Sequence, residues 1–176
     1  MTPNASETLR AAVREIPDFP KPGILFKDIT PILLDGKLFR LAIAEFSRGC
    51  EGMDVAKVAG IDARGFLFGA TLAHELGLGF VPIRKRGKLP GPTIREAYAL
   101  EYGESEIEIH SDAISPGERI VLVDDLLATG GTAAAAKRGI QRLGGVVTHI
   151  QFLIELTFLG GRAQLGSTPI QSLVAY

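Results

Sequence analysis

The 176-residue chain has one cysteine, no tryptophan and a formal net charge of only −1. The lone Cys50 cannot form an intramolecular disulfide, which suits a reducing compartment. A charge balance this even gives no electrostatic case for binding nucleic acid. No uninterrupted apolar run reaches membrane-spanning length, and the first ten residues lack the apolar core of a secretion signal. We therefore expect a soluble cytoplasmic protein.

Short apolar segments that favour strands alternate along the chain with amphipathic segments that favour helices. Strands are predicted at 55–61, 80–83, 120–123, 146–154 and 170–174, and the longer helices at 6–16, 38–48, 66–76 and 133–143. This alternation predicts an α/β fold, with a central, mostly parallel, twisted sheet and helices on both of its faces. The length suits a single domain over residues 1–176.

Two segments do not follow this alternation. Residues 1–35 include Pro17, Pro20 and Pro22, and we expect them to form a small N-terminal hood that covers the site. Residues 84–103 are predicted to form a flexible basic loop that leads into a β-pair. Neither segment is large enough to be a domain of its own.

The segment from Ile120 to Thr132 begins with four apolar residues, typical of a strand buried on both faces. Asp124 and Asp125 follow this strand. Small residues come next, and a helix-forming run begins at Ala133. The free N–H groups and the positive dipole of a helix N-terminus bind phosphate, and glycine lets an anion approach the backbone. The order of these residues therefore predicts a phosphate site.

Carboxylates repel phosphate, so Asp124 and Asp125 suit a different partner. Sugar hydroxyls that donate hydrogen bonds, or a hard cation such as Mg²⁺, would satisfy them. A ribose 5-phosphate would therefore satisfy both halves of the segment. The alternative is an ordinary strand–turn–helix corner in which Asp125 or Thr129 caps the helix. Two adjacent acids followed by Thr-Gly-Gly-Thr favour the ligand site.

Four other positions could serve such a site, and each has a structural alternative. Arg64 could bind a diphosphate bidentately or form a surface ion pair. The basic run Arg84–Lys88 could be a mobile loop for a leaving diphosphate, a solvated face, or a nucleic-acid patch without interleaved aromatics. Glu101 could exchange a proton with a purine nitrogen or be an exposed strand acid. Phe26 could stack on a flat base or belong to the core.

The segment 121–132 resembles the signature of the type I phosphoribosyltransferases, which use 5-phosphoribosyl 1-pyrophosphate (PRPP). Further matches lie at 19–28, 63–69, 84–92 and 100–103, and the resemblance extends from about Ile16 to Tyr176. The matches at 19–28, 84–92 and 100–103 are similar to the members that act on adenine. The resemblance implies that adenine and PRPP give AMP and diphosphate, with Mg²⁺ chelated largely by PRPP, in a homodimer.

The resemblance also implies a role for each residue of the site. Backbone atoms around Leu25, Phe26 and Lys27 would recognise adenine, with Phe26 stacking on it. Asp124 and Asp125 would hold the ribose hydroxyls, and Glu101 would donate or accept the proton of the purine. The 5-phosphate would be bound by Ala128, Thr129, Gly130, Gly131 and Thr132. The diphosphate would be contacted by Arg64, Arg84, Lys85 and Lys88, with Lys85 and its neighbours reaching across the dimer interface.

One position departs from the pattern of the family, since Lys27 stands where many relatives have arginine. Lysine keeps the charge but loses the planar fork that binds bidentately. Two other functions are open. A related enzyme would use another purine, such as xanthine or hypoxanthine. A non-catalytic regulator that senses PRPP and binds DNA should carry an extra DNA-binding element and a basic face, for which this chain has neither the length nor the charge.

Overall fold

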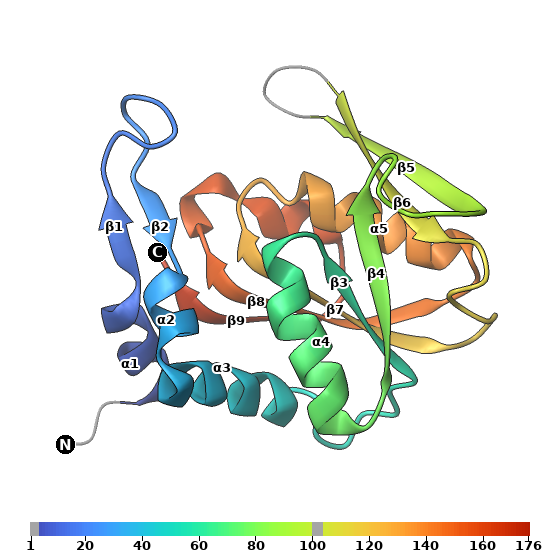
Figure 1. Ribbon diagram of the computed structural model, residues 1–176, viewed down its shortest axis with the longest axis horizontal. Coiled ribbons are helices and arrows are strands. Elements are labelled where there is room, and N and C mark those ends of the chain that lie inside the picture. The colour runs from blue at the N-terminus through green and yellow to red at the C-terminus, as the bar shows by residue number, and fades with distance from the viewer. Residues whose placement is uncertain (1–3, 100–103) are drawn as a thin grey trace.

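The computed structural model describes residues 4–99 and 104–176 (Figure 1). The helices are α1 (Ala5–Ala12), α2 (Thr30–Leu34), α3 (Gly36–Arg48), α4 (Arg64–Leu76) and α5 (Gly131–Arg142), with the 3₁₀ helices η1 (Thr157–Leu159) and η2 (Gly161–Leu165). The strands are β1 (Arg14–Ile16), β2 (Phe26–Asp28), β3 (Lys57–Ile61), β4 (Gly79–Lys85), β5 (Thr93–Ala99), β6 (Glu104–His110), β7 (Arg119–Leu127), β8 (Val146–Glu155) and β9 (Ile170–Ala175).

Seven strands form the central sheet, in the order β5-β6-β4-β3-β7-β8-β9. The five strands from β4 to β9 run parallel, whereas β5 and β6 pair antiparallel at one edge. The predicted α/β fold with a mostly parallel sheet is therefore confirmed. Because β3 and β7 are parallel neighbours, with Gly60 opposite Val123, the segments that follow them meet at one edge of the sheet.

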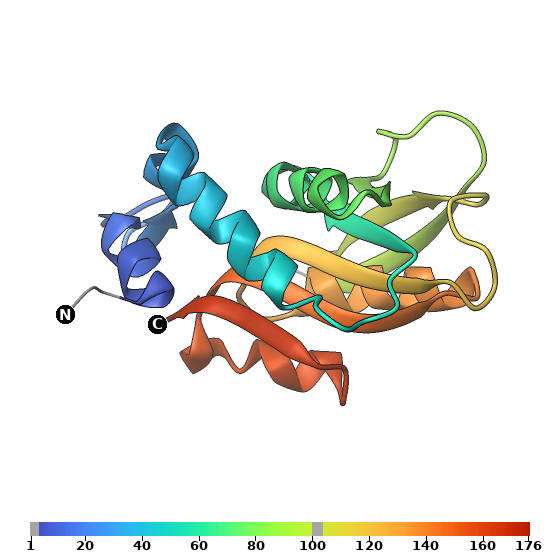
Figure 2. The ribbon, with the colours of Figure 1, turned by 90° about the horizontal axis from the view of Figure 1, so that it is seen from below.

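The sheet separates two apolar cores because its central strands are apolar on both sides. Val121 and Val123 of β7 pack with residues of α3 and α4, whereas Ile120 and Leu122 pack with α5. Figure 2 shows α4 on one side of the sheet and α5 on the other. The four alanines of α5, residues 133–136, are buried and let this helix lie close to the sheet. Among the described residues, the helices are all too short or too polar to cross a membrane.

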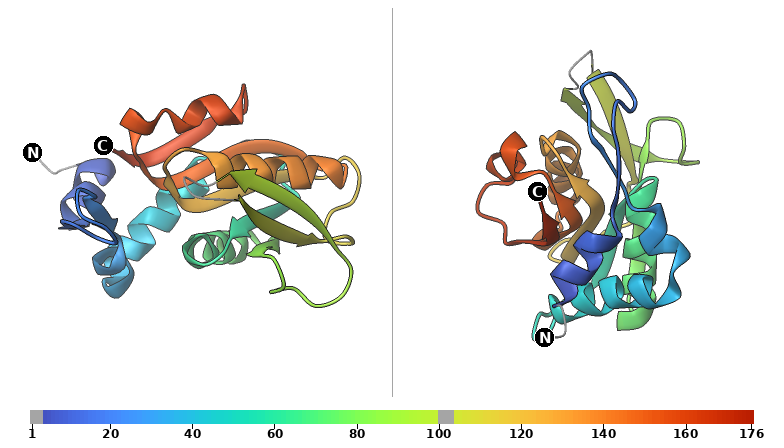
Figure 3. Two further views of the ribbon diagram at one scale, coloured as in Figure 1. Left: turned by 90° about the horizontal axis from the view of Figure 1, so that it is seen from above. Right: turned by 90° about the vertical axis from the view of Figure 1, so that its left-hand side faces the viewer.

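The N-terminal hood consists of α1, the β1–β2 pair and α2. The helix predicted for residues 6–16 ends at Ala12, and residues 14–16 form β1 instead. The apolar spacing was right for α1, but β2 offers residues 14–16 an antiparallel partner, with Arg14 opposite Asp28. That pair is also joined by an ion pair of 2.6 Å. Figure 3 shows the hood beside β9, to which the Ser6 hydroxyl donates a hydrogen bond at the Leu173 carbonyl.

The predicted basic loop is shorter than expected. Arg84 and Lys85 belong to β4, where they pair with β6, so that the turn covers only residues 86–92. Glycine and proline correctly predicted the turn, but they do not show how far an edge strand can extend. The β5–β6 hairpin is joined to α5, because the Glu96 carboxylate accepts hydrogen bonds from both Arg138 and Arg142. Together with the hood, this hairpin projects from one side of the sheet (Figure 1).

Strand β7 also differs from the prediction. It was expected to end at Val123, but it continues to Leu127 because β8 remains its partner as far as Glu155. Asp124 and Asp125 therefore lie within a strand, where successive side chains point to opposite faces. The acidic pair is held by strand geometry and not by a flexible turn.

Candidate active site

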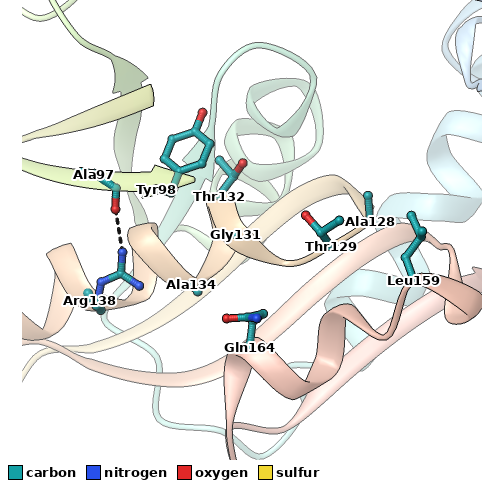
Figure 4. Close-up of a pocket in the computed structure, with 10 residues that line it drawn as sticks. All are labelled: Ala97, Tyr98, Ala128, Thr129, Gly131, Thr132, Ala134, Arg138, Leu159 and Gln164. Atoms are coloured by element: carbon teal, nitrogen blue, oxygen red, sulfur yellow. Dashed lines mark hydrogen bonds between the residues drawn. The ribbon is translucent and has the colours of Figure 1, made fainter. Parts of the chain in front are cut away.

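The first two residues of helix α5 and the three residues before them form a tight turn that we call the phosphate cradle, residues 128–132 (Figure 4). Gly130 precedes the first turn of the helix with φ of +85°, a backbone conformation that other residues seldom adopt. Among the described residues, no side chain caps the start of α5, so its first N–H groups are available to a ligand. The cradle lines a small hollow of about 80 Å³. Amide donors and the helix dipole converge there, as an anionic group requires.

The cradle rests on η2, a contact that the sequence did not predict. A side-chain carbon at Gly130 would collide with the Gly161 carbonyl oxygen, and one at Gly161 would collide with the Ala128 carbonyl oxygen. Helix η2 is held in turn by Arg162, which binds the Glu155 carboxylate with two hydrogen bonds of 2.6 Å. The Lys137 ammonium of α5 donates to the Leu165 carbonyl at the other end of η2. Contacts with η2 therefore fix the backbone conformation of the cradle.

Asp124 and Asp125 precede the cradle and differ in their surroundings. The Asp124 carboxylate accepts a hydrogen bond of 2.9 Å from the Asp125 amide and packs against Gly65, where a side chain would come within 2.7 Å of it. Burial raises the pKa of Asp124 well above its ordinary value, and the charge of Asp125 raises it further. Burial also raises the pKa of Asp125, but the positive charge of Arg64 opposes that rise. Hydrogen-bond donors of a bound ligand would favour the charged form of both carboxylates.

Arg64, the first residue of α4, forms an ion pair of 2.9 Å with Asp125. The side chain of Arg64 is 39% exposed, whereas that of Asp125 is only 9% exposed. The structure thus brings together two residues that were predicted to contact different parts of one ligand. Because the guanidinium is half exposed beside the start of a helix, it has N–H groups left for a second anion.

The basic residues of the turn after β4 lie in two settings. Arg84 pairs with Asp62, two residues before Arg64, at 3.2 Å, and also donates to the Lys88 carbonyl. Lys85 and Lys88 are exposed, and within residues 4–99 and 104–176 their ammonium groups form no ion pair. The structure therefore pairs Arg84 with Asp62 directly after β3, whereas in the described part of the chain Lys85 and Lys88 form no ion pair with Asp125.

The hood supplies the predicted base-binding residues. The guanidinium carbon of Arg64 lies 5.6 Å from the centre of the Phe26 ring, and Phe19 contacts the same ring edge-on at 5.1 Å. Leu25 is 48% exposed beside it. The Lys27 side chain is 9% exposed and pairs with Glu15. The predicted proton-transfer residue, Glu101, lies outside the described residues.

A larger hollow of about 610 Å³ adjoins the cradle and contains residues that the sequence did not single out (Figure 4). Its walls are formed by β5, the cradle, α5 and the η1–η2 segment, through Ala97, Tyr98, Ala128, Thr129, Gly131, Thr132, Ala134, Arg138, Leu159 and Gln164. Figure 4 shows Tyr98 beside Thr132, and Gln164 on the opposite wall. The adjacent glycines at 160 and 161 were the available signal for the η2 wall.

Comparisons with known proteins agree with this geometry. Residues 33–155 match the family model described as phosphoribosyl transferase domain. An adenine phosphoribosyltransferase of Mesorhizobium japonicum is 51% identical, over 100% of this chain and 98% of that protein. The crystal structure of adenine phosphoribosyltransferase from Thermoanaerobacter pseudethanolicus is 53% identical, with a TM-score of 0.95 over 97% of this chain and 99% of that one.

A structure of the Saccharomyces cerevisiae adenine phosphoribosyltransferase, complexed with D-2,5-dideoxy-2,5-imino-altritol 1,6-bisphosphate and adenine, is 41% identical. Its TM-score is 0.93, over 96% of this chain and 98% of that one. The mostly parallel sheet and the cradle after an acidic pair are those of a phosphoribosyltransferase. The chain belongs to the adenine phosphoribosyltransferase family.

Proposed function

We propose that the protein transfers the 5-phosphoribosyl group of PRPP to adenine and releases AMP and diphosphate, a reaction of purine salvage. The observation that carries this proposal is the position of the Arg64–Asp125 ion pair, between the phosphate cradle and the Phe26 ring. A 5-phosphate on the cradle puts a ribose beside the acidic pair. A diphosphate leaving from the ribose then meets Arg64, and a base stacked on Phe26 lies on the other side of the reacting carbon.

The chemistry of this proposal depends on position and charge. As the bond between the ribose C1 and the diphosphate breaks, the sugar gains positive character and the leaving group gains negative charge. Asp124 and Asp125 hold the ribose hydroxyls, and Arg64 stabilises the departing diphosphate. Arg84, Lys85 and Lys88 add positive charge at the leaving-group side. Closing the site excludes water, which would otherwise hydrolyse the activated sugar.

Mg²⁺ fits the donor set at this place, because carboxylate oxygens are its preferred protein ligands and PRPP supplies phosphate and hydroxyl oxygens of its own. We propose that oxygens of PRPP supply most of the ligands of the ion. Asp124 and Asp125 would then bind the ribose hydroxyls and lie near the ion for that reason. Bound there, the ion would neutralise charge on the diphosphate. For the same reason, the ion would reduce the repulsion between the phosphate groups of PRPP and the carboxylates of Asp124 and Asp125.

We further propose that the hood selects the base. The family model begins at residue 33, so Leu25, Phe26 and Lys27 lie outside the part that phosphoribosyltransferases share in general. Strand β2 pairs on one side with β1, and backbone groups of the Leu25–Lys27 segment that do not pair with β1 would recognise the edge of adenine. Glu101 would exchange a proton with the purine nitrogen.

A direct assay tests the proposed reaction. The protein is incubated with PRPP and Mg²⁺ and, in separate reactions, with adenine, hypoxanthine or xanthine, and the nucleotide products are identified. AMP formed from adenine supports the proposal. Product formed only from hypoxanthine or xanthine would reassign the base, and PRPP binding without any turnover would indicate a sensor.

We propose that the active form is a cytoplasmic homodimer. The lone Cys50 is buried, so no disulfide between copies through it is expected. Apolar side chains are exposed on α2 and α4, with Leu34 at 81% and Leu67 at 44%, and a shallow hollow of about 440 Å³ lies between α3 and α4. A second copy of the chain would cover this apolar surface. Light scattering should give twice the chain mass, and Leu67→Glu should shift it toward the monomer.

Lys85 is exposed and forms no ion pair within residues 4–99 and 104–176, which supports its use by the site of the partner copy. Mixing two inactive variants, Lys85→Ala and Asp125→Asn, tests this arrangement. If Lys85 acts across the interface, each heterodimer has one intact site and activity returns. If it acts within its own chain, both sites of the heterodimer are defective and activity stays low.

A further inference from the structure

The side chains of Phe26 and Lys27 point to opposite sides of β2, as neighbours in a strand do. Phe26 lies toward Arg64. The Lys27 ammonium lies 3.8 Å from the centre of the Tyr176 ring, on the side away from Arg64, and also pairs with Glu15. A lysine side chain that is 9% exposed needs partners for its charge, and the face of an aromatic ring is one of them. Lys27 thus has a defined position without any base.

Tyr176 is itself held by the main sheet through its backbone. Its amide donates to the Glu155 carbonyl at 2.9 Å, and its carbonyl accepts hydrogen bonds from the amide and the hydroxyl of Thr157. Glu155 ends β8 opposite Leu127 of β7, immediately before the phosphate cradle. Figure 1 shows the end of the chain beside β2. A continuous set of contacts therefore runs from the cradle through β8 to Tyr176 and Lys27.

We propose that Lys27 and Tyr176 form an anchor that fixes the distance and direction of the base-binding strand relative to the phosphate cradle. Lys27 is then a positioning residue, and its ammonium is not a ligand of the base. The neighbouring Phe26 is turned toward the site because Lys27 is fixed on the other side of the strand. This inference rests on the proposed function, since it assigns the segment around Phe26 to the base.

The anchor predicts a selective effect on adenine. The cradle is supported by η2 and α5, which do not depend on the Tyr176 side chain, so PRPP binding should not need the ring. Replacing Tyr176 by leucine removes the aromatic face but keeps the backbone bonds to Glu155 and Thr157. Replacing it by phenylalanine keeps the face and is the matched control.

Steady-state kinetics of Tyr176→Leu and Tyr176→Phe test the proposal. We expect Tyr176→Leu to raise the KM for adenine on the order of tenfold, through the lost contact with Lys27, and to leave the KM for PRPP within about twofold. The Arg10 guanidinium carbon, 4.6 Å from the centre of the same ring, loses that contact too, but Arg10 keeps its hydrogen bond to the Ala175 carbonyl. Tyr176→Phe should behave as the original protein. Equal defects in both variants, or an unchanged KM for adenine in Tyr176→Leu, would overturn the anchor.

A second pair of variants changes Lys27, the other residue of the anchor. This pair remains informative even if the Tyr176 variants do not fold. Lys27→Arg keeps a cation over the ring, whereas Lys27→Met keeps most of the apolar stem and removes the charge. Glu15 is half exposed, so it tolerates the loss of Lys27. Lys27→Met should raise the KM for adenine as Tyr176→Leu does, and Lys27→Arg should not. An unchanged KM for adenine in Lys27→Met, or an equal rise in both variants, would overturn the anchor.

Amide hydrogen exchange separates this inference from the proposed reaction. If the anchor exists, the amides of β2 exchange faster in Tyr176→Leu and Lys27→Met than in Tyr176→Phe and Lys27→Arg, whatever the substrate is. Absence of AMP formation by the unaltered protein would contradict the function but leave this difference. Equal exchange in all four variants would contradict the anchor even if adenine is the substrate.

Discussion

The Nε atom of Arg64 lies 2.9 Å from Oδ2 of Asp125, which joins the first turn of α4 to the end of β7. In the proposed complex these two residues bind different parts of PRPP. The Arg64 guanidinium contacts the diphosphate, and the Asp125 carboxylate contacts the ribose. In the protein alone each neutralises the other. The site is therefore organised before PRPP arrives, and binding exchanges one set of charged partners for another.

Removal of Arg64 should weaken inhibition by diphosphate. We expect Arg64→Ala to raise the inhibition constant of diphosphate by roughly 10- to 100-fold, since hydrogen bonds to charged groups contribute about 1.5–3 kcal/mol. Arg48→Ala, which removes an exposed guanidinium paired with Glu45 on α3, is the control. An unaltered inhibition constant in Arg64→Ala would count against the assigned contact.

Asp124 should make the protein less stable at high pH. Burial raises the pKa of Asp124 above its ordinary value of 3.8, so the folded state binds its proton more tightly than the unfolded state does. The resulting stabilisation is present below the ordinary pKa and is lost as pH rises through the folded-state pKa. Asp124→Asn keeps the acceptor for the Asp125 amide but removes the charge.

The thermal midpoint of Asp124→Asn should therefore exceed that of the original protein by a few degrees near pH ~8, and the difference should shrink toward pH ~4. Asp112→Asn, which removes an exposed carboxylate, is the control. The same Asp124→Asn protein should bind PRPP more weakly. Lower stability of this variant near pH ~8 would show that hydrogen bonding outweighs burial at Asp124.

Gly161 should matter for PRPP although it lies on η2 and not in the cradle. An alanine there collides with the Ala128 carbonyl and must displace the cradle or η2. We expect Gly161→Ala to raise the KM for PRPP about tenfold or more with a smaller effect on the KM for adenine. Gly36→Ala meets no atom within 4 Å and serves as the control. Equal KM values for PRPP in both variants would show that η2 does not set the cradle.

Glu101 should act on the rate more than on binding. If it transfers a proton, Glu101→Gln lowers kcat more than it raises the KM for adenine. The Glu96 carboxylate, which accepts from Arg138 and Arg142, holds the strand that precedes Glu101 in the chain. Glu96→Gln should therefore lower kcat in the same direction but by less, whereas Glu45→Gln on α3 should not. A rise in KM alone for Glu101→Gln would assign it to binding.

The sequence was sufficient for the fold class because β7 and its neighbours are apolar on both faces, which a buried parallel sheet requires. It also predicted the glycine turn at the start of α5, which the structure contains, while phosphate binding there stays a prediction. Periodicity could not show that residues 14–16 leave the helix, because their partner, β2, lies ten or more residues further along the chain.

Contacts between distant segments were likewise beyond the reach of local patterns. The support of Gly130 by Gly161 and the approach of Lys27 to Tyr176 depend on how β7, β8 and β9 are paired. The extension of β7 through Asp125 depends on β8 in the same way. Lys27 illustrates the difference, since the resemblance implied only that backbone atoms around it recognise adenine, whereas the contact of its side chain with Tyr176 depends on the fold.

A crystal structure of the protein soaked with AMP would test most directly whether one crevice holds the phosphate, the sugar and the base. We predict the 5-phosphate within hydrogen-bonding distance of the amides of residues 129–132, and the ribose hydroxyls at Asp124 and Asp125. The adenine ring should lie against Phe26. A nucleotide bound elsewhere, or bound with its phosphate away from the start of α5, would contradict the proposed site.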